Sequence, residues 1–155
     1  MSMEYLIFYF MFFFLGSSVG SFISVVIYRL PRGESIIHGR SHCDLCKKRL
    51  QWIDMIPLVS YLFLGGRCRH CRGKISAFYP FVEKLMGVLF VLVVYSIIGY
   101  NYPLLTDYRY LITVCYFLYI VSALMAIFFT DLRYGIIPFK IVFSSVILTL
   151  SLIHI

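Results

Sequence analysis

Four long apolar runs constrain the fold of this chain more than any other feature of its sequence. They cover residues 5–28, 81–99, 110–130 and 136–155, and each is close to the ~17–25 residues that a helix needs to cross a bilayer. Hydrophobic residues fill 61% of the 155 positions and charged residues only 14%, which excludes an ordinary soluble domain. The runs therefore predict an all-α polytopic membrane protein with about four transmembrane helices. The last run is the weakest, because Pro138 lies near its start.

The polar stretch between the first two runs carries four cysteines in a C-x2-C, x21, C-x2-C array. They are Cys43, Cys46, Cys68 and Cys71. Each C-x2-C turn can direct both sulfurs at one metal, so the spacing predicts a structural, tetrahedral Zn²⁺ site. Two redox motifs or two disulfides are the alternatives, which a reducing compartment disfavours. Cys115 lies in an apolar run, and we expect it to be buried as a small hydrophobe.

The basic residues of the chain predict its orientation. Ten Lys and Arg residues stand between positions 29 and 74 against three acids, whereas the loop at 100–109 holds one base and one acid. By the positive-inside rule the basic loop is cytosolic, so the N-terminus lies outside. We expect anionic lipid headgroups to attract this loop. A basic zinc ribbon also resembles a nucleic-acid-binding module, but the positive-inside bias already explains the charge, and we predict no nucleic-acid partner.

Two features of the spans concern packing and solvent. Gly16, Gly20 and Ser24 recur at i, i+4 and i+8, which makes one face of the first helix small enough for another helix to approach closely. We favour a neighbour within the same chain, with homodimerisation as the alternative. Glu83 and Lys84 follow the start of the second run, where we expect both to reach water or headgroups.

Asp131 stands where the third apolar run meets a short polar turn. An acid at the edge of a span can be merely interfacial. It can also be a carboxylate held at the cytosolic membrane boundary for general acid/base chemistry, because ionisable groups within spans are functional candidates. Such chemistry normally needs two carboxylates that share a proton, and the chain offers no second intramembrane Asp.

Several motifs occur in the order in which they occur in one known family. They are GSSVGSFISVV at 16–26, RLP at 29–31, SHCDLC at 41–46, DMIPLVSYL at 54–62, GGRCRHC at 65–71, and YPFVE at 79–83 preceded by Ser76. Together they resemble the amino-terminal half of the type IV prepilin leader peptidase/N-methyltransferases. The resemblance extends from about residue 15 to about residue 138.

The resemblance implies a membrane aspartic endopeptidase of the bacterial inner membrane, active in type IV pilus and type II secretion systems. Such an enzyme removes basic leader peptides from prepilins and pseudopilins, then methylates the new N-terminus with S-adenosylmethionine. The resemblance makes Asp131, in a D-x6-P pattern with Pro138, the first catalytic aspartate, and it places Gly66 and Arg67 in the region linked with methyl transfer.

The expected organisation has three parts. Residues 1–28 form the first transmembrane helix, residues 29–80 a small cytosolic zinc-binding domain with four cysteine ligands, and residues 81–155 a membrane domain with three further helices.

Three departures from the family pattern limit what the resemblance implies. Ser24 stands where Asn is usual, and Phe139 follows Pro138 where a polar residue is usual. The second catalytic aspartate belongs to a G-x-G-D motif, and the sequence has no Gly-Asp pair. We therefore expect either a truncated or degenerate paralogue, or an active site completed in trans by a separate fragment with that motif. The alternative function is a non-catalytic, zinc-containing membrane protein that binds prepilin-like or secretion-assembly partners.

Overall fold

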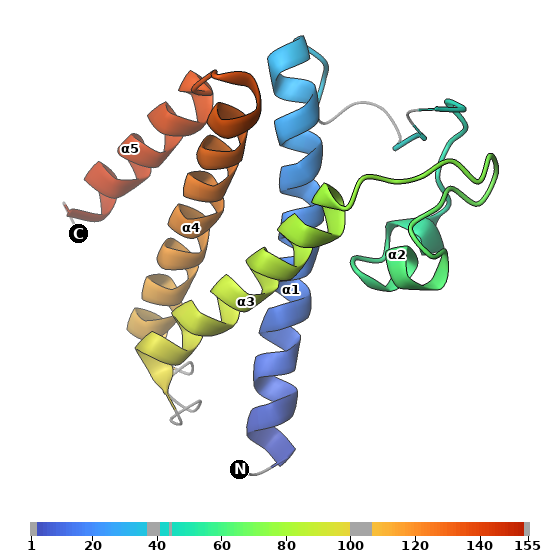
Figure 1. Cartoon of the computed structure of the whole chain (residues 1–155). Coiled ribbons are helices and arrows are strands. Elements are labelled where there is room, and N and C mark those ends of the chain that lie inside the picture. Colours follow the sequence, from blue (N-terminus) through green and yellow to red (C-terminus); the bar gives the residue numbers. More distant parts are fainter. Residues whose placement is uncertain (1–2, 37–40, 44, 100–106, 154–155) are drawn as a thin grey trace.

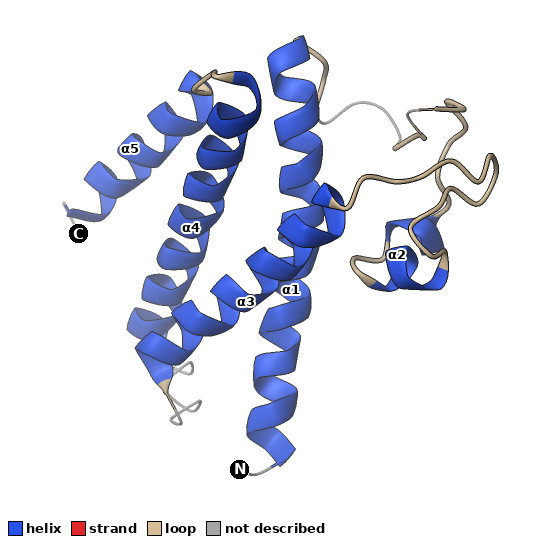
Figure 2. Cartoon of the chain, viewed as in Figure 1, coloured by secondary structure: helices blue, strands red, loops and turns tan. Residues whose placement is uncertain are grey.

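The computed structural model of the chain describes residues 3–36, 41–43, 45–99 and 107–153. Four long helices run through it, namely α1 (Met3–Arg29), α3 (Phe78–Ile98), α4 (Tyr108–Tyr134) and α5 (Phe139–Ile153), as Figure 1 shows. Three short helices, η1 (Leu30–Arg32), η2 (Trp52–Met55) and α2 (Val59–Phe63), lie between α1 and α3 in the chain. Within the described residues the only β structure is two isolated bridges (Figure 2). The predicted all-α fold is confirmed.

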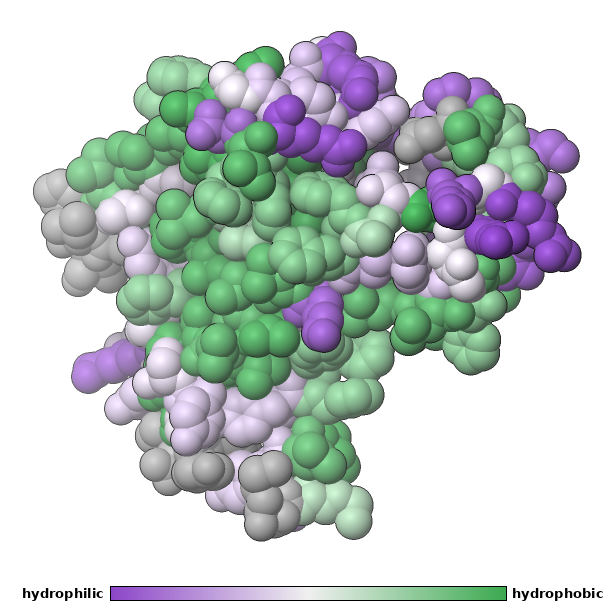
Figure 3. Space-filling model, in the orientation of Figure 1, coloured by the Kyte–Doolittle hydropathy of each residue, from purple (hydrophilic) through white to green (hydrophobic). Residues whose placement is uncertain are grey.

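Three helices of the described part are long and apolar enough to cross a membrane. They are α1 extended through Arg32, α3 and α4, and Figure 3 shows a broad apolar surface over the helical body. Helix α5 is also apolar but has only 15 residues, or ~22 Å of length against a hydrocarbon core of ~30 Å. It begins after Pro138, which has no N–H to donate and disfavours helical geometry in the residue before it. The fourth predicted run thus forms a helix shorter than the predicted span.

Helices α1 and α3 approach closely because glycines leave room on both of them. A Cβ atom on Gly16 would lie 2.6 Å from the carbonyl oxygen of Met86, and one on Gly20 would lie 2.9 Å from the Cα atom of Glu83. Gly87 of α3 is equally crowded by α1 side chains. The small-residue face of α1 is therefore filled by a helix of the same chain, as we predicted, since backbones can touch only where side chains are absent.

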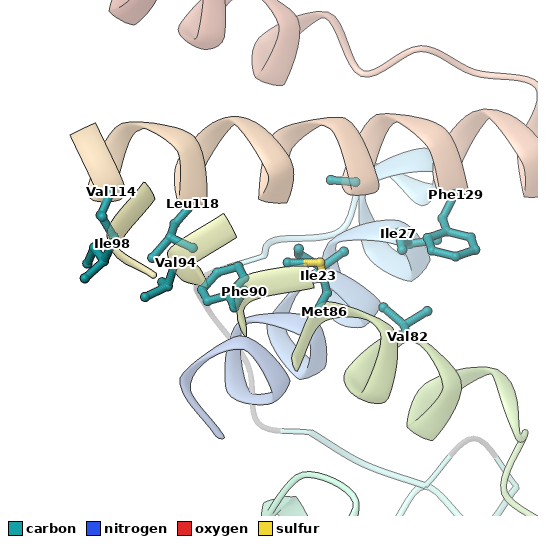
Figure 4. Packing of buried hydrophobic residues seen from close by; sticks show 11 residues of the cluster. Ile23, Ile27, Val82, Met86, Phe90, Val94, Ile98, Val114, Leu118 and Phe129 are labelled. Atoms are coloured by element: carbon teal, nitrogen blue, oxygen red, sulfur yellow. The ribbon is translucent and has the colours of Figure 1, made fainter. Parts of the chain in front are cut away.

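The hydrophobic core lies where α1, α3 and α4 meet, as Figure 4 shows in close-up. Its buried members are Ile23, Ile27, Val82, Met86, Phe90, Val94, Ile98, Val114, Leu118, Ala126 and Phe129. Helix α5 packs against α4. The stretch that carries the cysteines lies on the other side of α1 from α4 and α5 in the view of Figure 1. This arrangement leaves the polar stretch beside the helical core rather than within it.

Candidate metal centre and adjoining cavity

Two turns of the same geometry present the four cysteines. In the first, the Lys47 N–H donates to the Cys43 carbonyl at 2.9 Å, and in the second the Arg72 N–H donates to the Cys68 carbonyl at 2.9 Å. Lys47 and Arg72 follow the second cysteine of their turns and have φ of 56° and 57°, a region that residues other than glycine rarely adopt. Both turns therefore accept the same backbone strain, which bends each C-x2-C sequence back on itself.

The two turns bring all four sulfurs to one place. The Sγ atoms of Cys43, Cys46, Cys68 and Cys71 lie within 4.8 Å of one another. Those of Cys43 and Cys71, which come from different turns, are 3.8 Å apart. Tetrahedral zinc, with Zn–S bonds of ~2.3 Å, separates its sulfur ligands by ~3.8 Å. The donor set therefore fits a four-coordinate metal ion, and one cluster of four free thiols argues against two separate disulfides.

Hydrogen bonding distinguishes two of the four thiols. The backbone N–H groups of Cys71 and His70 lower the pKa of the buried Cys68 thiol to about 7. At Cys71 the Gly73 N–H lowers the pKa, but desolvation and the neighbouring thiols outweigh it and raise the pKa to about 11. The lowered pKa favours the thiolate form of Cys68. Since the thiolate is the form that binds metal, Cys68 is prepared to act as a ligand.

A cavity of about 220 Å³ separates the polar stretch from helices α1 and α3. We call the described residues 41–43 and 45–77 the cysteine segment. The cavity walls include Ser21 and Tyr28 of α1, Glu83 of α3, and Tyr61 and Cys68 of the cysteine segment. Small-molecule pockets usually measure ~300–1,000 Å³, so this cavity suits a small ligand or one part of a larger ligand. It is bounded by a metal-site cysteine on one side and by the membrane helices on the other.

The Glu83 side chain connects the cysteine segment to α3. It is 8% exposed, and its Oε2 atom accepts the Leu58 N–H at 2.8 Å. Leu58 has a φ of 60°, so the hydrogen bond stabilises a backbone conformation that leucine rarely adopts. Our expectation that Glu83 reaches water is wrong, because its helix face packs against Gly20 of α1. Lys84, one residue on, is exposed as expected.

A salt bridge attaches η2 to the second cysteine turn. The Arg69 guanidinium lies 2.8 Å from Asp54, whose side chain is only 3% exposed. The Gln51 N–H also donates to the Asp54 carboxylate, at 3.3 Å. Since exposed ion pairs contribute only ~0–1 kcal/mol, the burial of Asp54 matters here, because loss of Arg69 would leave a buried acid without its counter-ion.

Gly66 occupies a position where the Tyr61 side chain leaves no room for a Cβ atom. Its φ is 68°, and a Cβ atom there would lie 2.8 Å from the Tyr61 hydroxyl oxygen. Gly65, with a φ of 59°, has the same backbone requirement but open space around it. Gly66 is buried and Arg67 is exposed. Of the two residues that the resemblance linked with methyl transfer, Gly66 therefore touches a wall of the cavity.

Asp131 lies apart from the cysteines and the cavity. It is exposed in the last turn of α4, where its carbonyl accepts the N–H of the capping residue Gly135 at 2.7 Å. Next to it on α4, the Arg133 guanidinium stacks 4.9 Å above the Phe78 ring. The structure thus brings the four cysteines together and places Gly66 near them, but it does not bring Asp131 to the same site.

Two residues lie where our sequence reasoning did not place them, and helical periodicity held the missing signal for both. Glu83 precedes Met86 and Phe90 by three and seven residues, so the face of α3 that buries these two also buries Glu83. Cys115 is exposed, which contradicts the expected burial. It is next to Val114, which α4 buries, and one residue along a helix turns a side chain by about 100°.

Comparison with known proteins covers most of the chain. Residues 14–97 match the family described as Bacterial Peptidase A24 N-terminal domain. The chain is 38% identical over 140 residues to the prepilin leader peptidase/N-methyltransferase of Myxococcus xanthus, with 90% of this chain and 38% of that protein covered. The protein of the same name from Klebsiella pneumoniae is 43% identical over 89 residues, covering 54% of this chain and 39% of the relative.

A third relative of that name, from Dichelobacter nodosus, is 32% identical over 147 residues, which cover 77% of this chain and 48% of the relative. The chain thus spans less than half the length of each of these three relatives. No solved structure matches it significantly.

Proposed function

The chain belongs to the bacterial prepilin leader peptidase/N-methyltransferase family, and on this premise we propose that it supplies the first catalytic aspartate of a membrane aspartic endopeptidase. The proposed substrates are prepilins and pseudopilins, from which the enzyme removes the basic leader peptide. The observation that carries the proposal is the exposed Asp131 carboxyl group in the last turn of an apolar helix. A substrate that changes from a basic leader to an apolar helix has its cleavage point at the same kind of boundary.

In this proposal the boundary lies on the cytosolic side of the inner membrane. The Arg32 guanidinium donates to the Tyr134 hydroxyl at 3.4 Å, so the C-terminal ends of α1 and α4 are neighbours. Ten bases against three acids between residues 29 and 74 favour the cytosol for this end. Asp131 then faces the compartment in which prepilin leaders reside, and the N-terminus lies outside.

Asp131 would act as one member of a pair. An aspartic peptidase activates water with one ionised carboxylate while a second, protonated carboxyl group serves as acid. Neither α4 nor α5 contains another acid. In this proposal the second aspartate comes from a G-x-G-D segment outside these 155 residues, which is the motif that the resemblance to the family implies. If no such segment joins it, the alternative is a non-catalytic protein that binds prepilin-like or secretion-assembly partners.

We propose zinc as the metal of the four cysteines, in a structural role. Four sulfur ligands complete a tetrahedral shell and leave no position open for a substrate, which is typical of structural zinc sites. The metal would join two strained turns, and among the described residues of the cysteine segment only Cys68 belongs to the buried hydrophobic set. Bound zinc therefore supplies folding free energy to the cysteine segment rather than chemistry to the peptidase.

Methyl transfer is a second candidate function, and the cavity beside Gly66 favours it. Its walls combine the rings of Tyr28 and Tyr61 with the Glu83 carboxyl group, and they also include three bases, Arg29, Arg69 and Lys74. The rings and the acid suit the sulfonium of S-adenosylmethionine, and the bases suit its carboxylate. When bound, this donor supplies an electrophilic methyl group for the new amino terminus of the substrate. The volume of about 220 Å³ suits one part of the donor. Gly66 would keep Tyr61 in place as a wall, with Arg67 next to it on the surface.

Cleavage of a purified prepilin tests the peptidase proposal. The chain would be assayed in lipid nanodiscs, alone and with the carboxy-terminal half of a complete relative that carries G-x-G-D. We expect cleavage only in the second case and its loss in Asp131→Asn. Asp107→Asn is the matched control, because Asp107 caps the opposite end of α4 and Asn caps equally well. Cleavage that is indifferent to Asp131→Asn would favour the non-catalytic alternative.

The same reaction, analysed by mass spectrometry, tests methyl transfer separately. Gly66→Ala introduces a Cβ atom at the Tyr61 hydroxyl, whereas Gly65→Ala introduces the same backbone strain into open space. We expect Gly66→Ala to abolish methylation of the cleaved substrate while cleavage continues, and Gly65→Ala to retain both. Equal loss of methylation in the two variants would show that strain, not the cavity wall, is responsible.

A further inference from the structure

The stretch from η2 to α2, residues 52–63, exposes large apolar side chains on the side away from the cavity. The exposed fractions are 80% for Trp52, 63% for Ile53, 77% for Leu62 and 88% for Phe63. On its other side, Met55 and Tyr61 line the cavity. The cavity lining also includes Asp54 and Ser60 of this stretch, so its exposed side is the more apolar one, although the stretch belongs to none of the membrane-spanning helices. Exposed apolar groups of this size in one short stretch indicate an interaction surface.

The contacts of this stretch place it alongside the membrane-spanning part of α1. Leu58, in its middle, donates its N–H to Glu83, and the Glu83 Cα atom lies against Gly20. Gly20 precedes the last residue of α1, Arg29, by nine positions, which corresponds to ~13 Å along a helix. The middle of the stretch therefore lies beside α1, below its basic end and not beyond it.

The basic residues of the cysteine segment lie apart from its exposed apolar side chains. The exposed bases Lys47, Lys48, Arg69 and Arg72 belong to its two cysteine turns. Figure 3 shows this lobe, at the right, with hydrophilic residues at its top and outer edge around a small apolar patch, and with hydrophobic residues along its lower edge, level with the apolar surface of the helical body. A basic upper part and an apolar lower part match the headgroups and the acyl chains of one anionic leaflet.

From these observations we propose that residues 52–63 are an interfacial anchor whose exposed side chains insert into the acyl region of the leaflet that contains the C-terminal end of α1. The partner is lipid, because the exposed side chains of residues 52–63 lie at the same level as the apolar surface of the membrane-spanning helices. Interfacial segments typically enter ~5–10 Å into the headgroup and acyl boundary, where tryptophan is enriched. The anchor would hold the metal site and the cavity against the membrane, whether or not the chain cleaves prepilins.

The single tryptophan of the chain makes the proposal directly testable, because Trp52 is the only source of tryptophan fluorescence. The full chain would be placed in polymer-bounded discs of phosphatidylcholine and phosphatidylglycerol, which contain no scaffold protein, with bromine atoms at defined depths on the acyl chains in a parallel sample. We expect bromines near the top of the acyl chains to quench most of the Trp52 emission. Iodide in the aqueous phase should quench little of it.

A variant with Trp52→Phe and Lys48→Trp is the matched control, because it moves the reporter to the basic part of the same segment. Its emission should respond to iodide and not to brominated lipid. If Trp52 is quenched by iodide as strongly as this control, the stretch is in water and the proposal is wrong. If neither quencher reaches Trp52, a protein surface covers it, which also overturns the proposal.

Polar replacement of the anchor provides the second test. In a variant with Leu62→Ser and Phe63→Ser we expect Trp52 to lose much of its lipid quenching and to gain iodide quenching. Unchanged metal content would show that the cysteine segment remains folded. A variant that keeps its metal and also keeps full lipid quenching would contradict a role for these side chains in insertion.

Discussion

The Glu83 carboxyl group holds a backbone amide whose residue has an unfavourable conformation. Leu58 has a positive φ, and its N–H is directed at Glu83 Oε2 in a part-buried site. A buried N–H that loses its acceptor costs ~1–3 kcal/mol. Glu83 therefore determines whether the centre of the cysteine segment stays against α3.

Replacement of Glu83 should release this contact in a graded way. In Glu83→Ala we expect the Leu58 amide to exchange hydrogen faster, because it loses its acceptor, whereas Glu83→Gln keeps an acceptor oxygen and should retain most of the protection. Hydrogen exchange of a peptide covering residues 56–60, followed by mass spectrometry, measures this. Lys84→Ala changes an exposed neighbour and should have no effect. Equal exchange in all three variants would refute the role given to Glu83.

The proposed zinc site predicts a stoichiometry that depends on each of its cysteines. Purified protein should contain about one zinc ion per chain, and Cys68→Ser should lower this content strongly because it opens a closed structural site. Metal analysis by mass spectrometry measures the ratio. Cys115→Ser is the control, since Cys115 lies on α4 away from the cluster. Full zinc content in Cys68→Ser would disprove the assignment.

At the scale of elements, α1 and α3 can pack closely because glycines lie in the contact between them. Even one methyl group on Gly20 would meet the backbone of α3, so Gly20→Ala should force the helices apart at a cost of ~1–3 kcal/mol. Unfolding of the protein in mixed micelles with increasing SDS would measure the loss. Ser18→Ala, on an exposed face of the same helix, should leave the midpoint unchanged. A Gly20→Ala protein as stable as the parent would show that the helices do not pack as described.

The sequence predicted elements whose signals are local and missed features that depend on which faces meet. The lengths of the apolar runs predicted α1, α3 and α4, and the C-x2-C spacing predicted the sulfur cluster, because both follow from near neighbours in the chain. The burial of Glu83 depends on Gly20 of another helix. The exposure of Cys115 depends on the side from which α1 and α3 approach α4. Helical periodicity indicates which residues share a face, but not which face meets another helix.

The proposed catalytic role of Asp131 rests on the resemblance and on its exposed position, because its partner aspartate is not in the sequence. Its position in the last turn of α4 could be predicted from the end of an apolar run. The positive φ of Leu58 could not, since a leucine in an ordinary sequence context gives no signal of it. That conformation is imposed by the contact with Glu83 and by the path of the segment beside α3.

For the molecule as a whole, the distribution of bases predicts one orientation in the membrane. A reporter fused after residue 74 should be active only as a cytosolic reporter, and one fused after residue 107 only as an external reporter. Paired fusions of alkaline phosphatase and green fluorescent protein measure both sites. Replacement of Lys84 by Gln provides a control, since one base at the edge of a span should not reverse ten. An external position for residue 74 would overturn the orientation and, with it, the reducing environment of the thiols.

The position of Glu83 in the chain also orders the steps of biosynthesis. All four cysteines lie between residues 43 and 71, so they leave the ribosome before any of α3 does. Metal can therefore close the two turns while only α1 has entered the bilayer. The acceptor for the Leu58 N–H arrives later, with the second helix to be inserted. A nascent chain would thus carry a completed metal site attached to one transmembrane helix, α1. The insertion of α3 would then fix that site beside the membrane.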